Sequence, residues 1–174
     1  MGQFETYVGN GSREIYVAST QAGQATSTGL STTQTGITLT NPAGSGKTLV
    51  VLSVAGAVSA APAGASALVL AANVNPVAAA VTQTTPLTVR RANLGVAGTG
   101  AGLAASAVTL PAAPVVVRAL QSPVAASSIT PAQVLDNING ELCIAPGCAL
   151  SLSSITTAVT GVWSITWEEI DEIA

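Results

Sequence analysis

The acidic and aromatic residues of this chain are concentrated near its two ends. No aspartate or glutamate occurs between residues 15 and 135, and no aromatic residue occurs between residues 17 and 162. The long middle stretch must therefore pack from valine, leucine, isoleucine and alanine, while the bulky rings come from the termini. We expect the N-terminal segment and the last strand to lie close together or to share a partner.

The composition narrows the class of protein. Charged residues occupy 7% of the 174 positions and aromatic residues 3%, whereas apolar types reach 48% and the mean hydropathy is +0.56. Disordered chains combine low hydrophobicity with high net charge. This chain instead combines high hydrophobicity with low net charge. At a length of 174 residues, that combination predicts one globular domain with a single core.

The residue types also narrow the function. Histidine is absent, which removes histidine-dependent catalysis and most zinc and iron sites. Five basic residues and a net charge of −3 cannot cover a nucleic-acid backbone. No serine lies in a nucleophile-elbow motif, and no pair of carboxylates has an acid and base arrangement. We expect no catalytic residue, no cofactor, no metal site and no nucleic-acid partner, so the chain is not expected to be an enzyme.

Turn residues separate short runs rich in aliphatic and β-branched residues. The runs expected to be strands cover residues 36–40, 47–55, 66–74, 86–91, 115–120, 141–145, 149–153 and 162–170. Such spacing is typical of an all-β sandwich or barrel. The last run is the clearest, because Trp163, Ile165 and Trp167 alternate with polar residues. We expect both tryptophans to lie in the core.

Helical structure is expected at one place. Thr130 can cap a helix, Pro131 suits its first position, and one or two turns would follow over residues 132–137. Residues 49–72 carry no charge and are long enough to span a membrane as a helix. Glycine, serine and Pro62 interrupt this stretch, so we interpret it as two buried strands joined by a turn at residues 60–64.

Residues 41–48, Asn-Pro-Ala-Gly-Ser-Gly-Lys-Thr, resemble a Walker A phosphate loop. However, Asn41 replaces the first glycine, and the following run is of β type rather than a phosphate-binding helix. No carboxylate that could serve magnesium follows before Asp136. We interpret the segment as a glycine-rich hairpin turn with Lys47 in solvent, and a P-loop enzyme as the weak alternative.

The two cysteines flank the Pro146-Gly147 turn. Cys143 and Cys148 could form a disulfide if they faced each other across a four-residue loop. A turn centred on Pro146-Gly147 instead pairs Ala145 with Cys148 and places the sulfurs out of register. Two free thiols are therefore favoured.

The remaining charges are sparse. Arg90, Arg91 and Arg118 have no carboxylate near them in the sequence, so any ion pair they make is long-range or intermolecular. We expect at least one of them to pair with a terminal carboxylate or a neighbouring chain, with solvent exposure as the alternative. The acidic run at residues 168–172 could bind calcium or a basic partner, but such runs are usually solvated.

The chain resembles small structural proteins of tailed bacteriophages over roughly residues 35–170. The likeness rests on the serine-, threonine- and glutamine-rich N-terminal region, the segment 39–52, the Ala/Val-rich middle, the segment 144–147 before a strand, and the ending 163–169. Such proteins decorate or cement phage heads, or form fibre modules. The resemblance implies a jelly-roll fold and a homotrimer, whereas the residue pattern alone predicts only a β-sandwich.

We therefore expect an extended N-terminal arm over residues 1–35 and a jelly-roll β-sandwich domain over residues 36–174. Removing residues 1–20 is expected to leave the sandwich folded. The candidate partner contacts are three aromatic residues of the arm and three arginines: Phe4, Tyr7, Tyr16, Arg90, Arg91 and Arg118.

The expected function is capsid decoration. The chain would bind the major capsid protein as a homotrimer and stabilise the phage head. It would be made in the host cytoplasm and lie on the capsid surface of the virion. No membrane partner is expected. The alternative is a tail-fibre or receptor-binding module, for which Trp163 and Trp167 are the available aromatic platform.

Overall fold

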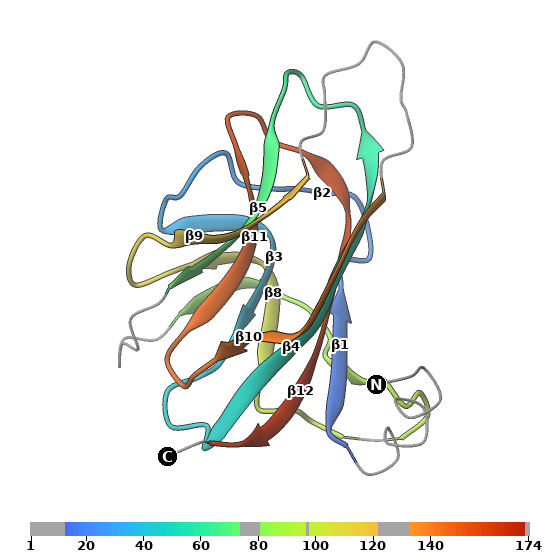
Figure 1. Ribbon diagram of the computed structural model, residues 1–174, viewed down its shortest axis with the longest axis vertical. Helices are drawn as coiled ribbons and strands as arrows, with labels where there is room; N and C mark the ends of the chain where they lie inside the picture. Colours follow the sequence, from blue (N-terminus) through green and yellow to red (C-terminus); the bar gives the residue numbers. More distant parts are fainter. Residues whose placement is uncertain (1–12, 74–80, 97, 122–132, 173–174) are drawn as a thin grey trace.

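The computed structural model describes residues 13–73, 81–96, 98–121 and 133–172. These residues form an all-β structure in which two antiparallel sheets pack face to face (Figure 1). The strands are β1 Ile15–Ser19, β2 Gln24–Ala25, β3 Thr33–Thr40, β4 Lys47–Ala60, β5 Ala67–Asn73, β6 Thr82–Pro86, β7 Arg90–Arg91, β8 Leu103–Thr109, β9 Val115–Gln121, β10 Gln133–Ile144, β11 Ala149–Ile155 and β12 Thr160–Asp171. The expected all-β sandwich is confirmed.

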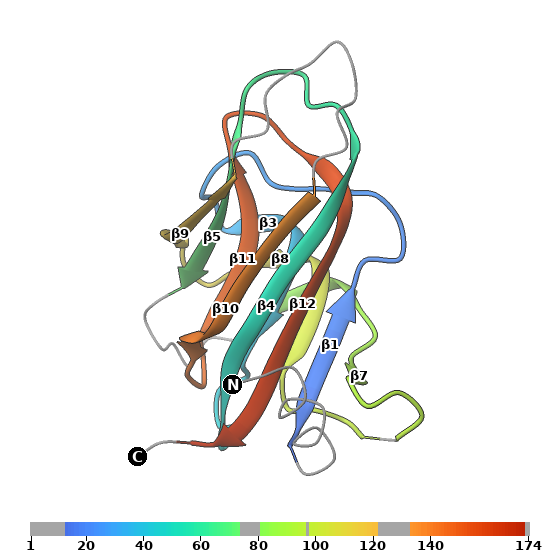
Figure 2. The same cartoon turned by 45° about the vertical axis from the view of Figure 1, so that its right-hand side comes forward.

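Each sheet has a simple strand order. Sheet A runs β10-β4-β12-β1-β7, with β2 also paired to β12, and sheet B runs β6-β8-β3-β11-β5-β9. Figure 2 shows the long strands of sheet A side by side, with β9 and β7 on opposite sides of the molecule. The edge strands β9 and β10 contact each other across the sheets. We call this the β9/β10 side, and the opposite edges the β6/β7 side.

The core lies between the two sheets and is built as the residue pattern predicts. Trp163 and Trp167 of β12 are both fully buried, as are Leu39 of β3 and Leu49 of β4, which belong to the same core cluster. The two strands expected within residues 49–72 are also present, as β4 and β5. Within the described ranges, no helix is long and apolar enough to cross a membrane.

The N-terminal segment differs from the expected arm. Residues 1–12 lie outside the described residues, but β1 is an inner strand of sheet A between β12 and β7. It pairs with β12 from Ile15 opposite Glu168 to Ser19 opposite Ser164, so the expected closeness of the two ends is confirmed. The arm is wrong for residues 15–19 because the short apolar run there, with Ile15 and Tyr16 buried, fills core positions.

The predicted helix is also wrong over residues 133–137, while its expected start at Thr130, Pro131 and residue 132 lies outside the described residues. Residues 133–144 form β10, which pairs with β4 along most of its length. Val134 and Ile138 are buried, and a four-residue spacing puts two side chains on one face of a strand as well as of a helix. The strand tolerates a break at a bulge where Asn139 and Gly140 have φ of 52° and 85°. Tertiary pairing with β4 therefore decided the local structure.

Candidate functional site

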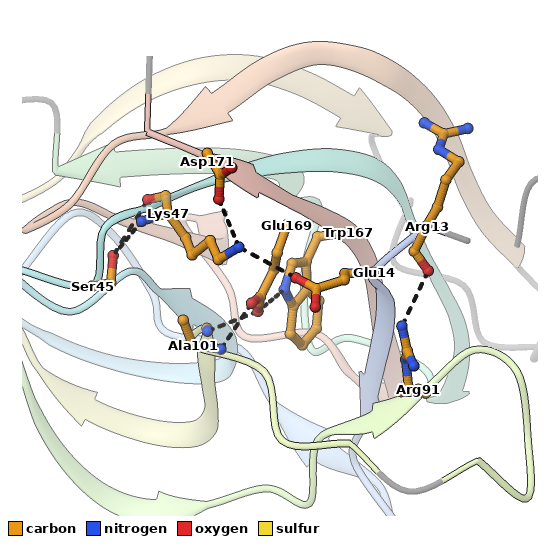
Figure 3. A network of polar contacts seen from close by, with 10 residues as sticks. Arg13, Glu14, Ser45, Lys47, Arg91, Ala101, Trp167, Glu169 and Asp171 are labelled. Carbon is orange, nitrogen blue, oxygen red and sulfur yellow. Dashed lines mark hydrogen bonds and ion pairs between the residues drawn. The ribbon is translucent and has the colours of Figure 1, made fainter. Parts of the chain in front are cut away.

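A polar network gathers at one end of sheet A (Figure 3). Its centre is Glu169, which is 5% exposed although it belongs to the acidic run expected to be solvated. Its carboxylate accepts hydrogen bonds from the backbone N–H groups of Ala101 (2.8 Å) and Gly102 (2.9 Å), and from the indole Nε1 of Trp167 (3.0 Å). A buried carboxylate needs such donors. Glu169 thus fastens the loop before β8 to the last strand.

The loop approaches Glu169 closely because it carries glycines. A Cβ added at Gly100 would lie 2.5 Å from Oε1 of Glu169, and one added at Gly102 would lie 2.9 Å from the indole nitrogen of Trp167. Neither position can carry a side chain without displacing the network. The repeated glycines of this loop therefore have a packing role.

Tyr16 was a predicted partner contact, and the structure corrects this. It is 3% exposed and stacks on Trp167, with ring centroids 6.0 Å apart and an interplanar angle of 27°. Burial, followed by the nearby carboxylate of Glu169, raises the pKa of its phenol. The guanidinium of Arg91 lies 6.0 Å from the ring centroid, at the limit of a cation–π contact. Tyr16 belongs to the core because β1 is an inner strand.

The segment 41–48 is a turn, as expected, although it is not a hairpin. It joins β3 of sheet B to β4 of sheet A. Asn41 is fully buried, and its side-chain nitrogen donates to the backbone carbonyls of Lys47 (2.7 Å) and Ile144 (2.8 Å). The residue that departs from the phosphate-loop pattern therefore holds the turn against the end of β10.

Lys47 makes ion pairs rather than lying free in solvent. Its Nζ is 2.9 Å from Asp171 and 3.5 Å from Glu14. The hydrogen bond with Asp171 raises the pKa of Lys47 and lowers the pKa of Asp171. Both contacts are exposed to solvent, so each contributes little to stability.

The second acid of the run is also paired. Glu168 is 8% exposed and forms an ion pair with Arg13, whose guanidinium hydrogen-bonds both carboxylate oxygens. This hydrogen bond raises the pKa of Arg13. Glu168 is therefore compensated by an opposite charge, whereas the neighbouring Glu169 is held by neutral donors.

Arg118 has the long-range pairing that the sequence predicts for at least one of the three arginines. From β9 it reaches Asp136 of β10, with Nε 2.7 Å from Oδ2, and Glu141, with an N–O distance of 2.5 Å. The pairs tie the edge strand of one sheet to the edge strand of the other. Hydrogen bonding to Glu141 raises the pKa of Arg118.

The other predicted partner contacts differ in their surroundings. Arg90 is exposed on β7, while Arg91 is partly buried and donates to the backbone carbonyl of Arg13 at 3.4 Å. Phe4 and Tyr7 lie outside the described residues. Of the four candidates among the described residues, the structure places Arg91 over the ring of Tyr16.

A cavity of about 290 Å³ opens on the β9/β10 side. Its walls come from β5, β9, β10 and β11 and from the turn after β10: Ala72, Asn73, Val117, Leu142, Cys143, Ile144, Ala145, Cys148, Ala149 and Leu150. The two cysteines are free thiols, Cys143 exposed and Cys148 buried. The turn pairs Cys148 N–H with the carbonyl of Ala145, as the spacing predicts.

No cluster of three or more potential metal ligands occurs in the part of the chain that the structure describes.

No protein-family model, curated protein or solved structure matches this chain. In the part of the chain that the structure describes, the apolar cavity and the exposed apolar edge of β9 beside it are candidate binding surfaces. The cavity could not be predicted from the sequence, because the residues of its wall come from four separate strands.

Proposed function

We propose that this chain is a structural virion protein: a head-decoration or cement protein of a tailed bacteriophage, built as a jelly roll and acting as a homotrimer on the capsid surface. The observation that carries the proposal is the strand order. Eight strands pair as β1-β12-β4-β10 and as β3-β11-β5-β9. Taken in chain order, these eight strands alternate between the two sheets at every step except where the inserted strands β6, β7 and β8 intervene.

That alternation supports the jelly-roll assignment, because a jelly roll consists of eight antiparallel strands in two sheets linked by Greek keys. The fold is used by capsid proteins, lectins and cupins, so the fold alone does not select a function. Cupin-type metal chemistry depends largely on histidine, which this chain lacks. The virion role is favoured among the remaining uses.

Exposed apolar side chains support self-association. The large hydrophobic residues with substantial exposure are Leu94, Val96, Leu103, Val115, Val116, Val117, Leu135 and Val162. A chain with so few charges has little to keep such surfaces apart in solution. Burial between subunits would remove them from water.

The proposed action is binding without catalysis. A subunit that binds the assembled lattice of the major capsid protein, and not its free subunits, stabilises the shell by mass action. We propose that attachment uses the N-terminal segment before β1, with Phe4 and Tyr7 as anchors. Tyr16 is removed from that role because it lies in the core.

A carbohydrate-binding tail module would use aromatic rings as platforms. Trp163 and Trp167 are both fully buried, so neither can serve. No specific observation therefore favours the tail alternative.

Quantitative mass spectrometry of virions whose genome encodes this sequence tests the proposal. A head-decoration protein should occur in hundreds of copies per particle and be lost from the shell without loss of the tail. A few copies per particle, or recovery with detached tails, would overturn the head assignment.

A further inference from the structure

The cavity on the β9/β10 side has an unpartnered polar group in its wall. Asn73 is 3% exposed, and its side-chain nitrogen has no hydrogen-bond partner among the described residues. Much of the surrounding wall is aliphatic, including Val117, Leu142 and Leu150. A buried donor without an acceptor is unfavourable. The Asn73 nitrogen has no accessible surface, so an occupant meets the aliphatic wall, and the cavity suits an aliphatic side chain.

The edge strand beside the cavity is unusually apolar. Residues 115–117 of β9 are three consecutive valines with exposures of 48%, 45% and 37%. Both edges of the opposite side carry features that discourage strand pairing: β6 ends at Pro86, and β7 consists of two arginines. The β9/β10 side is thus the one that needs a cover.

The opposite side of the sandwich presents an aliphatic residue on a tight turn. Leu94 is 78% exposed, the highest value among the large hydrophobic residues. The turn is closed by the backbone bond from Val96 N–H to the carbonyl of Asn93 at 3.2 Å, and Gly95 has φ of 92°. Its tip offers both a leucine side chain and backbone carbonyls.

The charges of the two sides are complementary. On the β9/β10 side, Arg118 faces two carboxylates, Asp136 and Glu141, which leaves one negative charge in excess. The side chain of Glu141 is 68% exposed. On the β6/β7 side, Arg90 is exposed and no carboxylate of the described residues forms an ion pair with it.

We propose that the two sides meet in a head-to-tail contact between copies of this chain. The Leu94 turn of one copy places its leucine side chain in the cavity of the next, and Arg90 faces Glu141. A contact between two different surfaces of one chain forms a ring when its rotation closes. The inference rests on the self-association in the proposed function and names the surfaces that make it.

Crosslinking tests the geometry directly. Cys143 lines the cavity and is exposed, so a Leu94→Cys variant should react with a short bismaleimide to give covalent dimers and trimers on a denaturing gel. Val162→Cys is the matched control, because Val162 is exposed on the strand β12 away from both sides. Cys148 is a second free thiol of the cavity wall, so the triple variant Leu94→Cys/Cys143→Ser/Cys148→Ser should give no ladder. Crosslinked dimers that persist in the triple variant would overturn the proposal, because position 94 would then meet itself.

Charge reversal tests the same contact independently. Arg90→Glu and Glu141→Arg should each weaken self-association severalfold in sedimentation equilibrium, and the double variant should restore it. Ala145→Arg, at an exposed position of the cavity wall, should block association while leaving the thermal unfolding midpoint unchanged.

The outcomes separate this inference from the proposed function. A parent chain that stays monomeric at high micromolar concentration would overturn both. A trimer whose stability is unaffected by Leu94→Ser, Ala145→Arg and the charge reversals would overturn the head-to-tail contact alone. Intact trimers that fail to bind shells would count only against capsid decoration.

Discussion

Trp167 and Glu169 lie two residues apart on the inner face of β12, and the indole nitrogen of Trp167 donates a 3.0 Å hydrogen bond to the carboxylate of Glu169. The same carboxylate holds two backbone N–H groups of the loop before β8. A buried acid in the last strand therefore positions a loop almost 70 residues away in the sequence.

We expect Glu169→Gln to destabilise the sandwich by about 1.5–3 kcal/mol, the range for hydrogen bonds to a charged group. Glutamine keeps the shape but replaces one acceptor oxygen with a donor that faces other donors. Chemical denaturation at neutral pH measures the loss. Glu172→Gln, at an exposed position, is the control and should leave the free energy of unfolding unchanged; equal stability of both variants would contradict this account.

Gly56→Ala is expected to destabilise the core. A Cβ at Gly56 would overlap the ring of Trp163, its cross-strand neighbour, which is fully buried and has no room to shift. Overpacking of this kind costs about 1–3 kcal/mol. Gly64→Ala, where the nearest atom is the Thr157 hydroxyl at 3.3 Å, should be nearly neutral. Thermal unfolding of both variants distinguishes a packing requirement from a general effect of losing glycine.

Two truncations should behave differently. Removing residues 1–20 deletes β1 and opens sheet A between β12 and β7, so we expect loss of cooperative unfolding and of near-ultraviolet dichroism from the tryptophans. This replaces the expectation that such a deletion leaves the sandwich folded. Removing only residues 1–12 keeps β1; the sandwich should remain folded and capsid attachment should be lost. Unimpaired attachment would place the anchor elsewhere.

The ion pair between Lys47 and Asp171 predicts a small stability difference that depends on pH. At neutral pH, Lys47→Gln should be slightly less stable than the parent. Since pairing lowers the pKa of Asp171, its contribution is present above the unfolded pKa and is lost as pH falls through the folded value, below about pH 4. Since pairing raises the pKa of Lys47, its contribution disappears as pH rises through the folded value, above about pH 10. A parent-to-variant difference that persists at both extremes would contradict the pairing.

The two thiols should differ in reactivity. Cys143 is exposed and Cys148 is buried, and burial raises the pKa of the Cys148 thiol. Because the thiolate is the reactive form, we expect one cysteine per chain to react rapidly with a disulfide reagent near pH 8 and the other only on unfolding. Cys143→Ser should abolish the fast phase and Cys148→Ser should retain it. Two fast thiols in the parent would mean that the turn after β10 opens readily.

Local pattern accounts for much of this fold. The β-branched run at residues 47–55 and the alternation of Trp163, Ile165 and Trp167 predict strands because side chains in a strand change face at every residue. Local pattern failed at β1 and at the start of β10. At both places a neighbouring strand supplied the pairing that decided the conformation.

The candidate site was harder to predict than the fold. Glu168 and Glu169 read as part of a solvated acidic tail, yet each is buried beside a partner far away in the sequence. The cavity with Asn73 in its wall likewise joins residues of four strands. No spacing rule links such positions, because their proximity depends on the sheet order.

The sequence by itself determined the class of structure and the chemistry that this protein lacks. Small aliphatic side chains, frequent turns and the lack of histidine are properties of the composition and of the local residue order. They can be recognised without knowing which strands lie side by side. Only the tertiary structure decided which charges are buried and which edges are exposed. These depend on the pairing of distant strands, since burial and contact are set by what lies across the sheet and not by what lies next in the chain.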